Sequence, residues 1–284
     1  MTHKAYYMVA GHRFCVEGDS EVLALMDNYA PFGCEAGDTI ATLHIAQGEA
    51  PDYQEEMRQD DEGQTIICGR TDIGQHVFGF LLSDSAAGWL ICNADYRDAR
   101  LIIANNDSHR LTKFALDNAL MVLYALATAD KQTVLFHAAV VSHEGRGYMF
   151  LGPSGTGKST HARLWLKHIG GTELVNDDNP VVRQGVVYGS PWSGKTPCYR
   201  NVSYPLGGIV MLSQAPYNKI CRLDGIHAYA ALVQSISGKR WEVSIADGLH
   251  RTENTLVSQV PIWHLECLPD EEAAQLCYET IRNS

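Results

Sequence analysis

A glycine-rich stretch with one lysine lies near the middle of the chain. Residues 152–160 read Gly-Pro-Ser-Gly-Thr-Gly-Lys-Ser-Thr, which matches the spacing G-x-x-x-x-G-K-[ST]. Glycines at these positions let backbone N–H groups approach an anion closely. Lys158 is expected to reach the β and γ phosphates of a nucleotide, and the Ser159 hydroxyl to bind Mg²⁺. The residues predicted to contact the phosphates are Gly152, Ser154, Gly155, Thr156, Gly157, Lys158, Ser159 and Thr160.

The surroundings of this loop support a nucleotide site. An apolar run at 147–151 precedes it and is typical of a buried strand. Residues 159–169 follow with helical character and are closed by Gly170-Gly171. A strand, a loop and a helix N-terminus in this order place the positive end of the helix dipole at the phosphate.

A second stretch, 189–196 (Gly-Ser-Pro-Trp-Ser-Gly-Lys-Thr), matches the same expression. Its middle positions hold Pro191 and Trp192, which fit poorly around a phosphate. Pro197 follows, and the residues after it do not have the pattern of a helix. We interpret this stretch as a loop and not as a second phosphate cradle, because it lacks the structural context that the motif requires.

Two adjacent acids, Asp177 and Asp178, end a predicted strand at 173–177. Phosphoryl transfer to a hydroxyl uses one carboxylate to hold a metal and another to orient the hydroxyl and accept its proton. A plain turn is the alternative, because Asn, Asp and Pro surround the pair. Their position after the phosphate loop and its helix favours catalysis. His137 lies in a predicted strand at 133–141. Two roles fit it equally from the sequence: a buried core residue, or a residue that faces the phosphates.

Residues 1–106 are predicted to form a β-rich lobe. Strand-length apolar runs separated by turn residues favour an antiparallel sheet in this part of the chain. The runs lie at 5–10, 39–45, 64–68, 76–82 and 88–92. The acidic stretch 48–63 is predicted to be an exposed loop.

Residues 107–284 are predicted to form the nucleotide-binding domain. Asp107-Ser108 offers an N-cap for a long buried helix at 109–129. Further strands are expected at 148–151, 206–213 and 261–267, with a hairpin at 181–188 that turns at Gln184-Gly185. Further helices are expected near 225–236, 244–258 and 269–282, although Gly248 weakens the second of them.

The composition narrows the function classes. The 284 residues carry a formal charge of −11, and no Lys/Arg cluster stands out, which disfavours nucleic-acid binding. Apolar residues make up 45% of the chain, enough for a well-formed core. The eight cysteines show no C-x-x-C pair, and no run reaches signal-peptide or membrane-spanning length. We therefore expect a cytoplasmic protein with reduced thiols and no membrane partner.

Three motifs in one order resemble the catalytic domain of HPr serine kinase/phosphorylase, within the phosphoenolpyruvate-carboxykinase-like superfamily. They are His137-Ala-Ala, the loop 152–159 and Leu174-Val-Asn-Asp-Asp178. Stretches at 190–206 and 265–270 are similar to HPr-kinase-like proteins of bacteria. The resemblance covers about residues 133–275. It implies an α+β or α/β fold in which a mixed central sheet surrounds the P-loop, beside the β-rich N-terminal lobe.

The resemblance also implies roles for single residues. Asp177 would be the general base toward a hydroxyl, and Asp178 and Ser159 would hold Mg²⁺. His137 would lie beside the base or the γ-phosphate. Lys195, in the second loop, would enter the site as a further cation that stabilises the transferred charge. The predicted catalytic residues are Asp177, Lys158, His137 and Lys195, and the predicted cofactors are ATP and Mg²⁺.

These observations favour an ATP-dependent kinase that acts on a hydroxyl of a protein, peptide or small molecule, which the N-terminal lobe would hold. The first alternative is a nucleotide-binding sensor or scaffold with little or no transfer, which would not need the base Asp177. A third reading, an NTPase that drives conformational work, has no evident arginine finger. The Glu-x-Arg-Gly segment of HPr kinases is not found after Gly189. The resemblance therefore does not imply that HPr is the phosphoryl acceptor of this protein. The oligomeric state, a homo-oligomer included, is left open.

Overall fold

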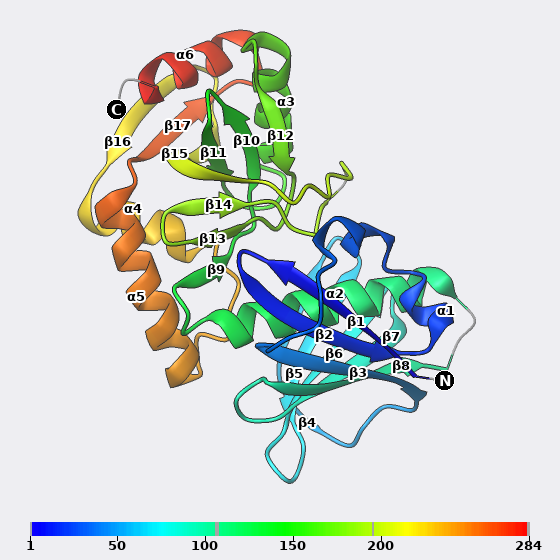
Figure 1. Cartoon of the computed structure of the whole chain (residues 1–284). Helices are drawn as coiled ribbons and strands as arrows, with labels where there is room; N and C mark the ends of the chain where they lie inside the picture. The colour runs from blue at the N-terminus through cyan, green and yellow to red at the C-terminus, as the bar shows by residue number, and fades with distance from the viewer. Residues whose placement is uncertain (1, 106–107, 195, 283–284) are drawn as a thin grey trace. The chain divides into compact units, whose positions relative to one another are not determined.

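The computed structural model describes residues 2–105, 108–194 and 196–282. The chain divides into two compact units, Met1–Thr128 and Ala129–Ser284 (Figure 1). The boundary lies after the long helix α2 (His109–Thr128), whereas the sequence placed it before this helix, at 106/107. The reason is packing, because α2 lies against strands of the N-terminal sheet.

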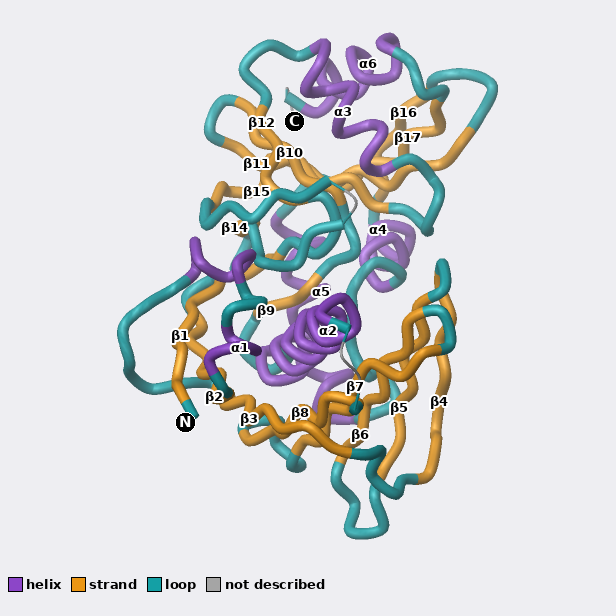
Figure 2. Tube along the Cα trace, turned by 90° about the vertical axis from the view of Figure 1, so that its right-hand side faces the viewer, coloured by secondary structure: helices purple, strands orange, loops and turns teal. Residues whose placement is uncertain are grey.

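In the described part of the first unit, eight strands form one sheet in the order β1-β2-β3-β8-β7-β6-β5-β4. The sheet curves around α2, which is seen end-on in Figure 2. The strands are β1 (His3–Val9), β2 (His12–Gly18), β3 (Ala41–Gly48), β4 (Gln54–Asp61), β5 (Gln64–Arg70), β6 (His76–Leu82), β7 (Ser85–Cys92) and β8 (Asp98–Ala104), with the short helices α1 (Ser20–Leu23) and η1 (Asp27–Phe32) between β2 and β3.

The expectation of a β-rich N-terminal lobe is confirmed, but the antiparallel prediction is wrong. β3 pairs in parallel with both β2 and β8, so the sheet is mixed. β2 and β8 were not expected as strands. β2 follows β1 through a tight turn at Ala10-Gly11, which lacks the Asn-Gly or Asp-Gly signature of such turns. The predicted loop 48–63 contains β4, an edge strand whose residues are nearly all exposed and therefore show no apolar alternation.

In the described part of the second unit, nine strands form a mixed sheet, as expected for its central sheet. Its main path is β12-β10-β11-β15-β14-β13-β9, and β17 pairs with β15 and with β16. The strands are β9 (Thr133–Leu135), β10 (Ala139–His143), β11 (Arg146–Leu151), β12 (Glu173–Asn176), β13 (Val181–Arg183), β14 (Val186–Tyr188), β15 (Ser203–Gln214), β16 (Lys219–Leu223) and β17 (Ile262–Cys267). β16 was not predicted.

The predicted strand 133–141 is two strands separated by 136–138. β9 pairs with β13, whereas β10 pairs with β11 and β12, so the chain crosses from one part of the sheet to another. In between, the backbone N–H groups of Phe136, His137 and Ala138 donate to Pro180, Ser235 and Asp178. His137 therefore lies in a connection and not inside a strand.

Among the described residues of this unit, four helices accompany the sheet: α3 (Lys158–His168), α4 (Gly225–Val233), α5 (Val243–Gln259) and α6 (Glu271–Ile281). α3 and α6 pack together, and Trp165 of α3 is fully buried in a core with Phe150, Val210 and Cys277. Among the described residues, no helix has the length and apolar character needed to cross a membrane.

Two local predictions are confirmed by hydrogen bonds and dihedral angles. Ser108 precedes α2, and its hydroxyl accepts from Leu111 N–H, as an N-cap does. Asp107, the other expected cap residue, lies outside the described residues. The hairpin between β13 and β14 turns at Gln184-Gly185, and both residues have positive φ (51° and 75°), as a type I′ turn requires.

The packing of α5 explains why a glycine, Gly248, lies inside this helix, where it weakened the helix prediction from the sequence. A Cβ on Gly248 would press against the carbonyl group of Ala129 and lie 2.7 Å from its carbon atom. We predict that Gly248→Ala destabilises the protein by about 1–3 kcal/mol through overpacking, although alanine is favoured over glycine in a helix by about 1 kcal/mol. Gly170→Ala is the matched control, because a Cβ there meets nothing within 4 Å. Denaturant unfolding measures both, and a Gly248→Ala variant as stable as the control would contradict this packing.

Candidate nucleotide and catalytic site

Strand direction brings three candidate segments to one edge of the second sheet. β10 lies between β11 and β12 and runs antiparallel to both. The ends of β11 and β12 and the start of β10 therefore share an edge, where the phosphate loop, the acid pair and His137 lie. Two strand spacings separate the strand that leads into the loop from the strand that leads into the acids, roughly 10 Å. β15 runs parallel to β11 and also ends at this edge.

The loop has the backbone geometry that its glycines predict. It leaves β11 at Gly152 (φ 148°) and enters α3 at Gly157 (φ 107°). A Cβ on Gly152 would lie 3.2 Å from the Leu212 carbonyl oxygen, in addition to the strain of its φ. Among the described residues, no side chain caps α3 at Gly157, whereas Asp270 caps α6. The first turn of α3, with Ser159 and Thr160, keeps amide groups that have no acceptor within the helix.

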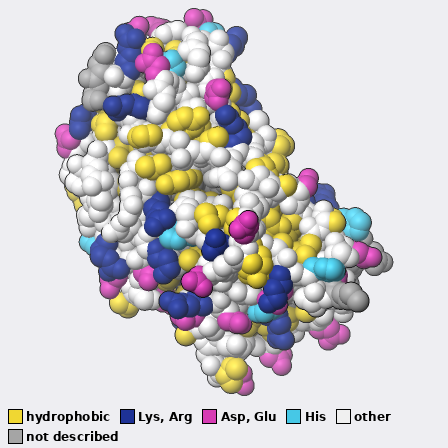
Figure 3. Space-filling view, in the orientation of Figure 1, with side chains coloured by type: hydrophobic (Ala, Val, Ile, Leu, Met, Phe, Trp, Pro, Cys, Tyr) yellow, Lys and Arg dark blue, Asp and Glu magenta, His cyan; other side chains and the backbone are white. Residues whose placement is uncertain are grey.

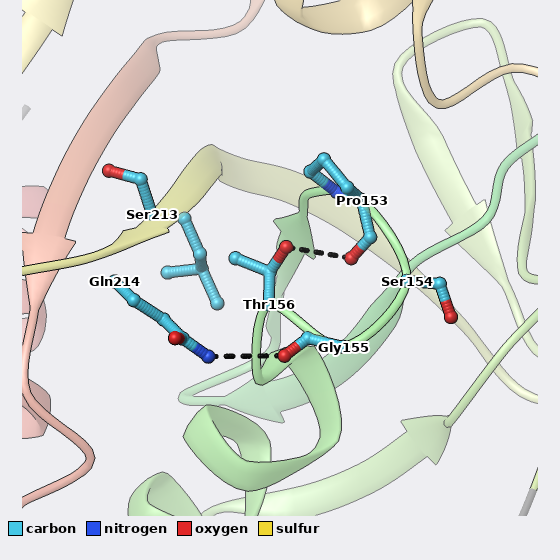
Figure 4. A pocket seen from close by; sticks show the side chains of 7 residues that line it. Pro153, Ser154, Gly155, Thr156, Ser213 and Gln214 are labelled. Atoms are coloured by element: carbon cyan, nitrogen blue, oxygen red, sulfur yellow. Dashed lines mark hydrogen bonds between the residues drawn. The ribbon is translucent and has the colours of Figure 1, made fainter.

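Side chains hold the loop from two sides. Lys158 is buried (9% exposed), and its Nζ donates to the carbonyl oxygens of Gly152 (2.9 Å) and Pro153 (3.3 Å). Figure 4 shows Gln214, at the end of β15, beside the loop, where its side-chain amide donates to the Gly155 carbonyl at 3.1 Å. In the same view the Thr156 hydroxyl donates to the Pro153 carbonyl at 2.7 Å. A shallow hollow lies between loop residues 153–156 and the end of β15.

The acid pair follows β12 directly. Asp178 Oδ1 lies 3.1 Å from His137 Nδ1, and Asp178 Oδ2 accepts a hydrogen bond from the side-chain Nδ2 of Asn179 at 2.8 Å. Asp177 is more buried, 7% exposed, and its Oδ2 accepts from Thr196 N–H at 3.2 Å. Burial strengthens the interaction of a carboxylate with any donor placed against it.

The stretch with the second motif match lies against the acid pair. A Cβ on Gly194 would lie 3.1 Å from Asp178 Cβ, a tight contact, so the two segments are closely packed here. Arg200, further along, donates to the Leu174 carbonyl at 2.7 Å and so covers the outer edge of β12. The interpretation of this stretch as a loop is confirmed, because residues 189–202 contain no helix or strand among those described. Lys195, the predicted catalytic cation, lies outside the described residues.

His161, one turn into α3, was not singled out by the sequence. It is 3% exposed, its Nε2 accepts from Trp165 Nε1–H at 3.2 Å, and its ring lies edge-on to Phe150. Burial lowers the pKa of His161 to about 4. The neutral imidazole thus forms a hydrogen bond within α3 and packs on Phe150 of β11, the strand that leads into the phosphate loop.

The donor set fits a hard cation. Ser159 and Asp178 would offer one hydroxyl and one carboxylate, and Mg²⁺ in proteins takes one or two carboxylates together with phosphate oxygens of the substrate. Such an arrangement does not need a protein cage, and among the described residues no group of three or more His, Cys, Asp or Glu side chains is placed to form one. On the face in Figure 3, Lys and Arg side chains are interspersed with Asp and Glu side chains.

Comparison with known proteins leaves the family open. A scan against protein-family models and a search of the curated proteins each found no match. The resemblance to HPr kinases therefore stays a prediction that rests on the motifs.

The sequence did not point to Asn176, Ser190 or Gln214, which hold the candidate site together. Asn176 was interpreted as a turn former and as part of the motif 174–178 without a role of its own, although its place directly before two acids at a strand end was a signal. Ser190 and Gln214 gave no signal of these roles, because the Asn179 and Gly155 carbonyl oxygens to which they donate lie 11 and 59 residues away in the chain.

Because the imidazole of His161 is buried, we expect the stability of the folded protein to depend on pH. The pKa of His161 is about 4 in the folded protein and 6.5 in an unfolded chain. As pH falls from 6.5 to 4 the unfolded chain takes up a proton that the folded protein does not, so stability is lost, by up to about 3 kcal/mol. We predict that His161→Gln, which keeps an acceptor for Trp165, removes this part of the pH dependence.

Denaturant unfolding at a series of pH values measures the effect. The control is His227→Gln, because His227 is exposed on α4. If His161→Gln and wild type lose stability in parallel between pH 6.5 and 4, the buried neutral state of His161 is wrong.

Proposed function

We propose that this protein is an ATP- and Mg²⁺-dependent kinase of the HPr-kinase-like class, which transfers the γ-phosphate to a hydroxyl of a protein, peptide or small molecule. One observation carries the proposal: a phosphate loop at a helix N-terminus shares a sheet edge with a pair of aspartates. A triphosphate bound at the loop with its terminal group toward β12 would meet a carboxylate on the acceptor side. Bound Mg²⁺ would neutralise charge on the phosphates.

The two aspartates suit different roles. Both oxygens of Asp178 have neighbours, His137 and Asn179, which hold its carboxylate in a fixed orientation for a cation. For Asp177 the structure gives one hydrogen bond from a described residue, the Thr196 amide to Oδ2. This supports Asp177 as the group that orients the hydroxyl and accepts its proton. Lys158 would leave the loop carbonyls to contact the β and γ phosphates.

The role of Lys158 predicts a loss of nucleotide binding. Lys158→Met keeps the length of the side chain and removes its charge, so the affinity for ATP should fall by about tenfold or more, as for the loss of a charge-assisted contact. Lys167→Met is the control, because Lys167 lies in the last turn of the same helix. Titration with labelled ATP measures the affinity of both variants. Equal affinities for ATP would contradict the assignment of this loop to the nucleotide site.

The role of Asp177 predicts a loss of transfer without a loss of binding. Asp177→Asn keeps the shape and the acceptor for Thr196 N–H but cannot take up the proton. We expect the rate of phosphate transfer to fall by about 100-fold or more, while the dissociation constant for ATP stays within about twofold of wild type, a difference worth less than 0.5 kcal/mol.

Single-turnover transfer and ATP titration measure the two quantities separately. The control is Asp130→Asn, because Asp130 is an exposed acid paired with Lys131. Transfer at the wild-type rate by Asp177→Asn would show that another group is the base. ATP binding without transfer by the wild-type protein would favour the sensor or scaffold.

A further inference from the structure

Asn176, the last residue of β12, is fully buried and uses every hydrogen-bonding group of its side chain. Its Oδ1 accepts from Asp178 N–H at 2.9 Å. The two N–H bonds of its Nδ2 donate to Ser190 Oγ and to the Trp192 carbonyl oxygen, both at 3.1 Å. The side chain is 0% exposed, so water cannot replace a bond that is lost.

The partners of Asn176 are themselves bonded to each other and to the acid turn. The Ser190 hydroxyl, also 0% exposed, donates to the Asn179 carbonyl at 2.6 Å and accepts from Trp192 N–H at 3.2 Å. Asn176 and Ser190 thus join two segments, the acid turn 177–179 and the covering loop, which we define as residues 190–194 and 196. The network is fully satisfied, and networks of this kind hold one conformation.

The covering loop reaches the carboxylates directly. Thr196 N–H donates to Asp177, and Gly194 packs against Asp178. A shift of the covering loop would therefore change the position of both acids.

We infer that Asn176 is a positioning residue, which fixes the covering loop and the acid pair as one rigid unit at the acceptor side of the site. Its place in catalysis rests on the proposed function, whereas the coupling of the two segments does not. Alanine at 176 would leave the Asp178 amide, the Ser190 hydroxyl and the Trp192 carbonyl each without one partner. Ser190→Ala removes the hydroxyl of the network in the covering loop. It leaves the hydrogen bond from Asp178 N–H to Asn176 Oδ1 in place.

Hydrogen exchange and kinetics test this together on the full-length protein. Exchange of the Trp192 and Thr196 amide hydrogens reports the covering loop, because Trp192 N–H donates to Ser190 within the network and Thr196 N–H donates to Asp177 beside it. In Asn176→Ala and Ser190→Ala we expect this exchange to accelerate by about tenfold or more. We expect kcat for phosphate transfer to fall by on the order of 100-fold, as for reacting groups displaced by about 1 Å, with the Kd for ATP unchanged.

Thr252→Val is the matched control. It removes another buried side-chain hydrogen bond of the second unit, from the Thr252 hydroxyl to the Gly248 carbonyl in α5. It should lower stability without faster exchange at Trp192 and Thr196 and without a loss of kcat.

The outcomes separate the inference from the proposed function. Unchanged exchange at Trp192 and Thr196 in Ser190→Ala and Asn176→Ala overturns the inference, and so does an equal loss of kcat in Thr252→Val. If the wild-type protein transfers no phosphate, the proposed function fails, and the exchange rates still decide whether Asn176 couples the two segments. If Asn176→Ala does not fold, Ser190→Ala carries the same test.

Discussion

The direction of three adjacent strands is the constraint on which the candidate site depends. β10 runs opposite to β11 and β12, so the turns that follow β11 and β12 must leave the sheet on the same side. The phosphate loop and the acid pair are brought to one edge by this pairing, although about 25 residues separate Gly152 from Asp177 in the chain. Burial of Trp165 and His161 of α3 against the sheet then fixes the helix whose N-terminus closes the loop. A slip of β10 by one residue would turn each of its buried side chains to the opposite face of the sheet and displace His137 from Asp178.

Short-range chemistry was predictable from the sequence, and long-range pairing was not. The glycine spacing of the loop, the serine cap of α2 and the turn at Gln184-Gly185 follow from backbone preferences that act over a few residues. The parallel pairs of β3 and the break at His137 depend on partners far away in the chain, which no local pattern encodes. β4 was not predicted because nearly all its residues are exposed, so its sequence lacks the alternation of apolar and polar residues that indicates a strand. The pairing of His137 with Asp178 likewise required the sheet order.

Polar side chains, more than the apolar core, determine the local geometry of the candidate site. Lys158 and Gln214 hold carbonyl oxygens of the phosphate loop, and Asn176 and Ser190 hold the acid turn. The described residues of the second motif match lie against the acid pair, a place that the family resemblance had implied for this loop. Its described residues form a loop without a helix, and its small residue Gly194 lies close to Asp178. An acidic protein can bind a nucleotide at such a place, because amides, one lysine and a bound cation act locally.

Transfer of labelled γ-phosphate tests the central claim most directly. The purified protein is incubated with γ-labelled ATP, Mg²⁺ and a cell lysate, and the chemical form of the label is followed with and without a chelator. Our account predicts that label accumulates as a phosphate ester on a hydroxyl-bearing acceptor, only when the protein and Mg²⁺ are both present. Label that stays on ATP, or is released only as inorganic phosphate, would contradict a kinase and leave a nucleotide-binding or hydrolysing protein.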